Sequence, residues 1–158
     1  MKIWIALYLL VALGAGAVCA QETNTVVSPV APEKVSQSQI LSAIEGGNID
    51  AMKSVLEKVG DPVAKLYLQA CVDRLEGKPE DALKKVAEVV AFHYQDMDWL
   101  PYAELLCAEL YDETGMTNAA AVTARQIGVL YKGTEFAKKA DALRSKIEEG
   151  GSDEGAKE

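Results

Sequence analysis

The fold of this chain is decided by a six-residue phrase that occurs three times: GGNIDA at Gly46–Ala51, GKPEDA at Gly77–Ala82 and GMTNAA at Gly115–Ala120. Each copy lies between two stretches whose apolar residues recur every three or four positions, as in amphipathic helices. A Gly that ends one helix, a polar turn and a small residue early in the next helix specify a tight helix–turn–helix. The phrases begin at intervals of 31 and 38 residues, so the sequence predicts an array of helical hairpins.

Seven helices are expected, and no segment after residue 34 alternates as a strand would. Ser36 or Ser38 is expected to cap the first helix, and Thr117 or Asn118 the sixth. The fourth helix is expected to bury Tyr94 with its other apolar residues. The expected ranges are 36–45, 49–59, 63–76, 79–94, 99–114, 117–130 and 134–148.

The first twenty residues follow the pattern of a secretory signal peptide. Lys2 precedes an apolar run that reaches about Val18, and Val18 and Ala20 occupy the −3 and −1 positions of a cleavage site before Gln21. Two alternatives stay open: an uncleaved membrane anchor, and lipidation of Cys19 as in bacterial lipoproteins. We therefore expect an exported protein of the periplasm or cell envelope. Residues 21–34 are expected to form a disordered linker, 35–149 the helical domain and 150–158 a disordered tail.

The charge balance argues against nucleic acid as a partner. The chain has 16 basic and 24 acidic residues and a net charge of −8. Such a surface repels phosphate backbones and anionic lipid headgroups. A membrane partner is expected only if the leader is retained or Cys19 carries a lipid.

No residue pattern in the sequence indicates catalysis, a metal site or a cofactor. His93 is the only histidine, and no nucleophile elbow, phosphate loop or CxxC motif accompanies it. A weak ion site at His93, Asp96 and Asp98 is conceivable, but a solvated loop is the favoured interpretation. We therefore predict a protein that is not an enzyme, that has no small-molecule substrate, and that needs no cofactor.

Beyond the leader, the chain contains two cysteines, Cys71 and Cys107. They lie 36 residues apart in neighbouring hairpins whose repeat is 38, an offset of roughly 200° around a helix. Their side chains are therefore expected either to meet across the seam between the two helices or to point apart. An oxidising compartment would permit a disulfide in the first case. In the second, both are small buried apolar residues, which is the favoured interpretation.

The residues around the glycine phrases resemble the tetratricopeptide repeat (TPR), which places Gly near the end of helix A and Ala five positions later in helix B. Ala70, Ala108 and Tyr111 match further helix A positions, whereas Gln69 and Asp73 depart from the pattern. The closing stretch LYKGTEFAKKADALRSKI resembles the end of TPR domains in bacterial envelope proteins. The resemblance covers roughly residues 36–148. It implies a short right-handed α-solenoid with a C-terminal capping helix, in which Ala51, Ala82 and Ala120 let helix B approach helix A closely.

Tetratricopeptide arrays hold a partner segment on the concave surface lined by their A helices. By this resemblance the expected function is that of a non-catalytic protein-binding or scaffolding module, whose partner is a protein or peptide segment. A self-associating structural subunit is the alternative. The side chain of Tyr67 could equally belong to the core. The residues implied in partner binding are Tyr67, Arg74, Tyr102, Glu109 and Asp112.

Overall fold

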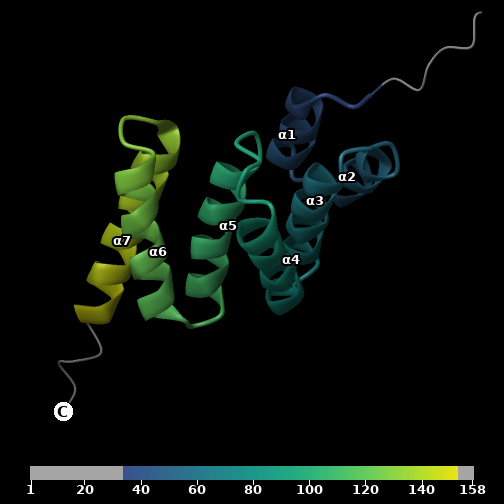
Figure 1. The fold of residues 1–158 in the computed structure, drawn as a ribbon. Coiled ribbons are helices and arrows are strands. Elements are labelled where there is room, and N and C mark those ends of the chain that lie inside the picture. Colours follow the sequence, from purple (N-terminus) through teal and green to yellow (C-terminus); the bar gives the residue numbers. More distant parts are fainter. Residues whose placement is uncertain (1–33, 153–158) are drawn as a thin grey trace, which may run out of the picture. The chain divides into compact units, whose positions relative to one another are not determined.

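The computed structural model describes residues 34–152, which form seven α-helices and no strand (Figure 1). All seven belong to one compact unit. The all-α class is thereby confirmed. The expected leader, most of the linker, and residues 153–158 of the tail lie outside the described residues. The helices are α1 (Gln37–Glu45), α2 (Ile49–Leu56), α3 (Pro62–Leu75), α4 (Pro79–Phe92), α5 (Leu100–Glu113), α6 (Thr117–Leu130) and α7 (Glu135–Ser152).

Each helix packs against the next one in the sequence, and α1 also contacts α3 while α5 contacts α7. From α3 to α7 the chain reverses direction at each connection, so α3, α5 and α7 begin at the end where α4 and α6 end (Figure 1). Short connections follow from this pairing of neighbours. None of the helices in residues 34–152 is long and apolar enough to cross a lipid bilayer.

Local signals explain where most helices begin. The Ser36 hydroxyl accepts a hydrogen bond from the Gln39 backbone amide, and the Ser36 backbone amide donates one to Gln39 Oε1, which completes a capping box. The side chains of Asn48 and Asp61 cap α2 and α3 by accepting hydrogen bonds from backbone amides, and Pro62 occupies the first turn of α3. Ser36 is thus one of the two caps expected for the first helix.

The cap expected for the sixth helix is wrong. Neither Thr117 nor Asn118 lies before α6, because the helix already begins at Thr117 and Met116 holds the capping position without a side-chain hydrogen bond. The turn that precedes it is closed by backbone bonds instead. The Met116 amide donates to the Tyr111 carbonyl and the Gly115 amide to the Asp112 carbonyl, so no side-chain cap is needed to join α5 to α6.

Three glycines adopt a left-handed backbone at the turns within the hairpins: Gly47, Gly77 and Gly115, with φ of 62°, 76° and 77°. This conformation disfavours every residue that carries a Cβ. In the first phrase it is the second glycine that takes it, because Gly46 stays right-handed with φ of −67°. The first turn is therefore one residue later than the phrase predicted.

That shift changes which residue packs at the first hairpin. Ala82 and Ala120, five positions after Gly77 and Gly115, are completely buried, as expected. Ala51 is exposed, and the buried residue five positions after Gly47 is Met52. The close-packing role predicted for Ala51 is therefore wrong, and a much larger side chain occupies the equivalent position.

Two other expectations about the helices are corrected. Helix α4 ends at Phe92, so Tyr94 lies in the connection to α5, where it is 60% exposed instead of buried. Helix α7 continues to Ser152, into the segment expected to be a disordered tail.

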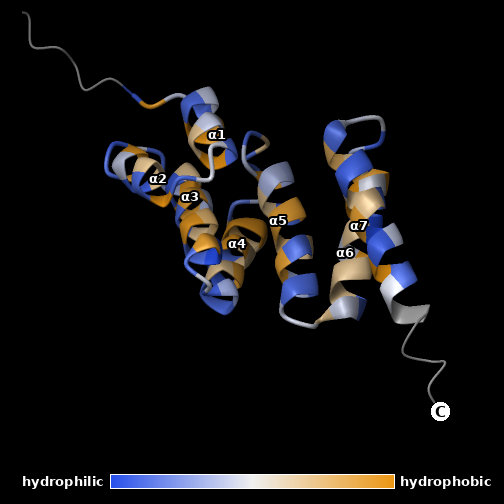
Figure 2. Ribbon diagram, turned by 180° about the vertical axis from the view of Figure 1, so that it is seen from behind, coloured by the Kyte–Doolittle hydropathy of each residue, from blue (hydrophilic) through white to orange (hydrophobic). Residues whose placement is uncertain are grey.

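The core forms two clusters. The larger one is built from α1 to α5 and includes the fully buried Ile40, Met52, Leu68 and Leu110. The smaller one joins α5, α6 and α7 through Leu105, Ala108, Ala124, Ile127 and Ala140. Figure 2 shows hydrophobic segments on α3, α4 and α5, whereas α7 is largely hydrophilic. The polar face of α7 exposes Lys138, Lys139, Asp141, Lys146, Glu148 and Glu149.

Candidate partner-binding groove

A chain of aromatic rings connects α3, α5 and α7. Tyr67 lies with its ring centroid 5.4 Å from that of Trp99 and 6.0 Å from that of Tyr102. Tyr102 meets Phe136 of α7 edge-on, with centroids 4.7 Å apart and an interplanar angle of 89°. Offset and edge-to-face pairs of this kind stabilise packing beyond the area that they bury. The rings thus link α3, α5 and α7 by direct contact.

A groove of about 190 Å³ runs along these helices. A second hollow of about 170 Å³ shares three of its lining residues, and Met52 and Leu75 extend it towards α2. The floor is apolar and aromatic, and charged side chains stand on the walls. The groove is lined by Ile44 of α1, Tyr67, Cys71 and Arg74 of α3, Tyr102, Leu105, Leu106 and Glu109 of α5, and Phe136 and Lys139 of α7.

Tyr67 forms part of the floor. Its side chain is only 7% exposed, and burial raises the pKa of its hydroxyl well above the ordinary value, with the neighbouring Cys71 adding to the effect. Of the two alternatives left open for Tyr67, the structure shows the core residue. Its ring packs in the interior, and it touches the groove only as part of the floor.

Arg74 forms the most extensive polar contact on the groove wall. One guanidinium nitrogen lies 2.6 Å from Glu109 Oε2, and two others donate to Glu113 Oε1 at 2.5 and 2.9 Å. Burial alone would lower the pKa of Arg74, but the hydrogen bonds that Arg74 donates to Glu113 and the charge of Glu109 outweigh it and raise the pKa. Because Arg74 comes from α3 and both glutamates from α5, this cluster ties two helices together.

Asp112 plays a different part from the one predicted. Its carboxylate binds Lys146 of α7 at 2.8 Å and does not line the groove. This hydrogen bond raises the pKa of Lys146. Of the five predicted residues, four line the groove and Asp112 ties α5 to α7 beside it.

The prediction also missed residues. Phe136 and Lys139 of α7 line the groove, and Glu113 completes the Arg74 cluster. Phe136 and Lys139 stand three positions apart and so share a helix face. That spacing could have indicated that α7 contributes to the groove. The polar composition of the helix favoured its interpretation as a capping helix without a binding role.

The two cysteines are free thiols in the structure, and both are buried. Burial raises the pKa of Cys71 to about 12, although a hydrogen bond with Tyr67 partly offsets it. Burial also raises the pKa of Cys107, which has Tyr111 as its hydrogen-bond partner. A thiol with a raised pKa is a poor nucleophile and a poor metal ligand near neutral pH. Both cysteines therefore behave as small core residues here.

Hydrogen bonds within the loop at His93 hold it in a turn. Asp96 Oδ1 accepts hydrogen bonds from the Asp98 and Trp99 amides at 3.2 and 3.1 Å. The Asp96 amide donates to the His93 carbonyl at 2.9 Å. The Asp96 carboxylate thus serves to close a turn before α5, which matches the interpretation of this stretch as a loop.

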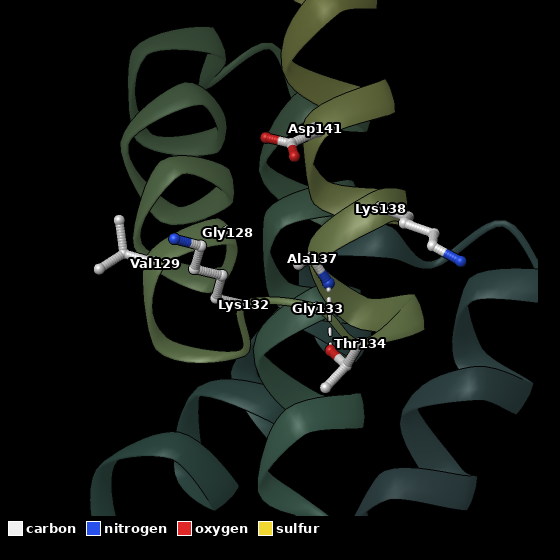
Figure 3. Close-up of a pocket in the computed structure, with 8 residues that line it drawn as sticks. All are labelled: Gly128, Val129, Lys132, Gly133, Thr134, Ala137, Lys138 and Asp141. Atoms are coloured by element: carbon white, nitrogen blue, oxygen red, sulfur yellow. Dashed lines mark hydrogen bonds between the residues drawn. The ribbon is translucent and has the colours of Figure 1, made fainter.

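A hollow of about 490 Å³, larger than the groove, lies between the end of α6 and the start of α7 (Figure 3). Figure 3 shows Lys132 and Lys138 on opposite sides of it and the Thr134 hydroxyl accepting a bond from the Ala137 amide, at 3.4 Å. Lys138 is already paired with Glu135 at 2.6 Å. The lining contains no aromatic side chain and no cluster of buried polar groups. The groove along α3, α5 and α7 is better equipped to hold a ligand.

Comparison with known proteins gives little guidance. No protein-family model matches the chain, and no solved structure matches it. Over 52 residues, 32% of this chain, it is 40% identical to a phosphoenolpyruvate synthase of Aeropyrum pernix. The matched stretch is 6% of the length of that enzyme. A likeness of this extent shows no shared family.

Proposed function

We propose that this chain is an exported, non-catalytic protein-binding module of the tetratricopeptide type, and that its groove along α3, α5 and α7 holds a segment of a partner protein. The observation that carries the proposal is the convergence of Tyr67, Arg74, Tyr102 and Glu109, selected from the sequence, on a single groove. The successive packing of neighbouring helices and the additional α1–α3 and α5–α7 contacts support a short solenoid.

The lining suggests how such a segment is held. An apolar side chain of the partner would lie on the floor formed by Cys71, Tyr102 and Phe136, where it would be removed from water. Arg74 and Glu109 neutralise each other on one wall, and Lys139 stands on another. Aromatic and Arg side chains are typical anchors at interfaces because they combine area with directed polar contacts. The binding mode is therefore that of an apolar anchor with a polar rim.

A photo-reactive amino acid placed at Lys139 tests the proposal in the native cell. Lys139 lies on the groove wall and is exposed, so the replacement leaves the core intact. The matched control is the same amino acid at Lys84, an exposed position of α4 that lies outside the groove. We expect a discrete cross-linked protein from position 139 alone. It should be lost when Ile44→Trp fills the groove while the protein stays folded. Identical products from both positions, or none from position 139, would refute the proposal.

Self-association is the second candidate, and exposed aliphatic side chains favour it. Val122, Val129 and Leu130 all lie exposed on α6, and a second copy could cover them. Analytical ultracentrifugation separates the two functions. A monomer is expected from the proposal, whereas a stable dimer that Val129→Ser dissociates would favour the structural subunit.

A further inference from the structure

The connection between α4 and α5 exposes three large apolar side chains close together. Phe92 is 77% exposed, Tyr94 60% and Met97 64%, and all three lie within six residues. We call this cluster the α4–α5 tip. None of the hollows described above includes any of the three. A contiguous group of exposed aromatic and aliphatic residues marks a contact surface more often than isolated ones do.

The α4–α5 tip has a defined backbone turn, and its three apolar side chains are exposed. Asp96 closes the turn by accepting from the amides of Asp98 and Trp99. Trp99, which directly follows, is only 3% exposed and packs on Tyr67. The connection is therefore fixed at one end by α4 and at the other by the buried Trp99.

The start of the first helix lies at the same tip. Gln37 Nε2 donates to the Asp98 carbonyl at 2.7 Å, which joins the beginning of α1 to the α4–α5 connection (Figure 1). The sequence that precedes α1 therefore joins the helical unit beside Phe92, Tyr94 and Met97. That preceding sequence contains the apolar run from Ile3 to about Val18.

We propose that the α4–α5 tip docks the helical unit onto the surface of an electrically neutral phospholipid bilayer, with Phe92, Tyr94 and Met97 entering the interface between headgroups and acyl chains. Aromatic side chains with one polar end favour that interface. A bilayer is the favoured occupant because the cluster lies on a connection between helices, at the point where the chain that follows the apolar leader enters the helical unit. This surface is separate from the groove, so the two proposals stand or fall independently.

The charges beside the tip select the kind of lipid. Asp96 and Asp98 flank Met97, and the chain without its leader carries a net charge of −9, because Lys2 is the one charged residue among the first twenty. Anionic headgroups would repel this end of the molecule. Binding is therefore expected to phosphatidylcholine vesicles, to weaken when phosphatidylglycerol is mixed in, and to recover partly when salt screens the repulsion.

Vesicle flotation of residues 21–158 tests the proposal without the apolar leader, since the helices form a compact unit with its own core. The double variant Phe92→Ser, Tyr94→Ser is expected to lower the fraction bound to phosphatidylcholine vesicles about tenfold or more, because two exposed apolar side chains no longer enter the interface. The matched control is Met116→Ser, which removes an exposed apolar side chain at the opposite end of α5 and should bind as the parent does.

A second measurement does not depend on the strength of binding. Tryptophan placed at the tip by Tyr94→Trp should shift its fluorescence to the blue when vesicles are added, whereas Met116→Trp should not. A parent protein that stays unbound on neutral vesicles, equal shifts at both positions, or unchanged flotation of the double variant would each overturn the proposal. Loss of a cross-linked protein partner in the double variant, without any vesicle binding by the parent, would assign the tip to a protein interface and overturn it as well.

Discussion

The first helical hairpin and the two that follow solve the same packing problem with residues of different size. In each, a left-handed glycine is followed five positions later by a fully buried side chain. That side chain is alanine in the second and third hairpins and methionine in the first. The helices of the first hairpin have 9 and 8 residues, whereas those of the other two have 14 each. The spacing from glycine to buried residue is thus preserved while its bulk is not.

This difference shows what each hairpin depends on. Where alanine is buried, the two helices approach closely and long apolar faces stabilise them. Where methionine is buried, one flexible side chain fills the space between two short helices. Apart from Met52, the only buried residue of these two helices is Ile40. We therefore expect the first hairpin to respond most to loss of volume and the others to gain of volume.

Removing the buried methionine should have the largest effect. Met52→Ala is expected to lower the free energy of unfolding by about 2–5 kcal/mol, because it leaves a cavity that short helices fill poorly. Chemical denaturation measures the loss, and hydrogen exchange should place it in α1 and α2. An effect under about 1 kcal/mol would mean that the first hairpin contributes little to the cooperative fold.

Adding volume at the alanines should have the next largest effect. Ala82→Trp or Ala120→Trp is expected to cost about 1–3 kcal/mol, since neither position has room for a ring. The same change at Ala51, which is exposed, should leave the melting temperature within a few degrees of the parent. If Ala51→Trp destabilised as much as Ala82→Trp, the assignment of Met52 instead of Ala51 as the buried residue of the first hairpin would be incorrect.

Substituting alanine for either glycine of the first turn tests which of the two has the left-handed backbone. Gly47→Ala is expected to cost about 1 kcal/mol or slightly more, because it places a Cβ in the left-handed region. Gly46→Ala should be close to neutral or slightly stabilising, because that residue is already right-handed. Thermal unfolding of the pair gives the answer, and the reverse order would contradict the structure.

The smallest of these effects on stability is expected from alkaline pH, which acts on the second hairpin through Cys71. The folded-state pKa of Cys71 is about 12 against an ordinary value of 9.0. Its stabilising contribution is therefore complete below pH 9.0 and is lost as the pH rises towards 12, while the unfolded thiol ionises first. Between about pH 8 and pH 10 the expected loss is about 1 kcal/mol. Cys71→Ala should flatten this part of the stability profile; an unchanged slope would show that another group causes it.

Predictions from local patterns succeeded where one short stretch contains the whole signal. The starts of α1, α3 and α4 were recognisable to within a residue, because the cap Ser36 and the prolines Pro62 and Pro79 act within a single turn. The end of α4 was not. The segment beyond Phe92 continues the apolar spacing through Tyr94, and only the turn made by Asp96 shows that the chain has already left the helix.

The candidate groove could be predicted in part. Residues of α3 and α5 were found because the resemblance to tetratricopeptide repeats implies a binding surface lined by these helices, but Phe136, Lys139 and Glu113 were not. Their role depends on which neighbouring helix they meet. In the same way, the position of Asp112 within α5 could not reveal that Lys146 of α7 would be its partner.

Local signals in the sequence are enough to predict the all-α class, the order of the helices and the approximate positions of the hairpin turns, since these follow from the periodicity of apolar residues and from glycine. The tertiary structure alone decided which glycine of the first pair turns left-handed and which residue after it is buried. It also decided which charged residues form pairs between helices. The physical reason is range: a cap or a turn is stabilised within four or five residues, whereas the burial of Met52 and the ion pairs of Arg74 depend on side chains brought in from other helices.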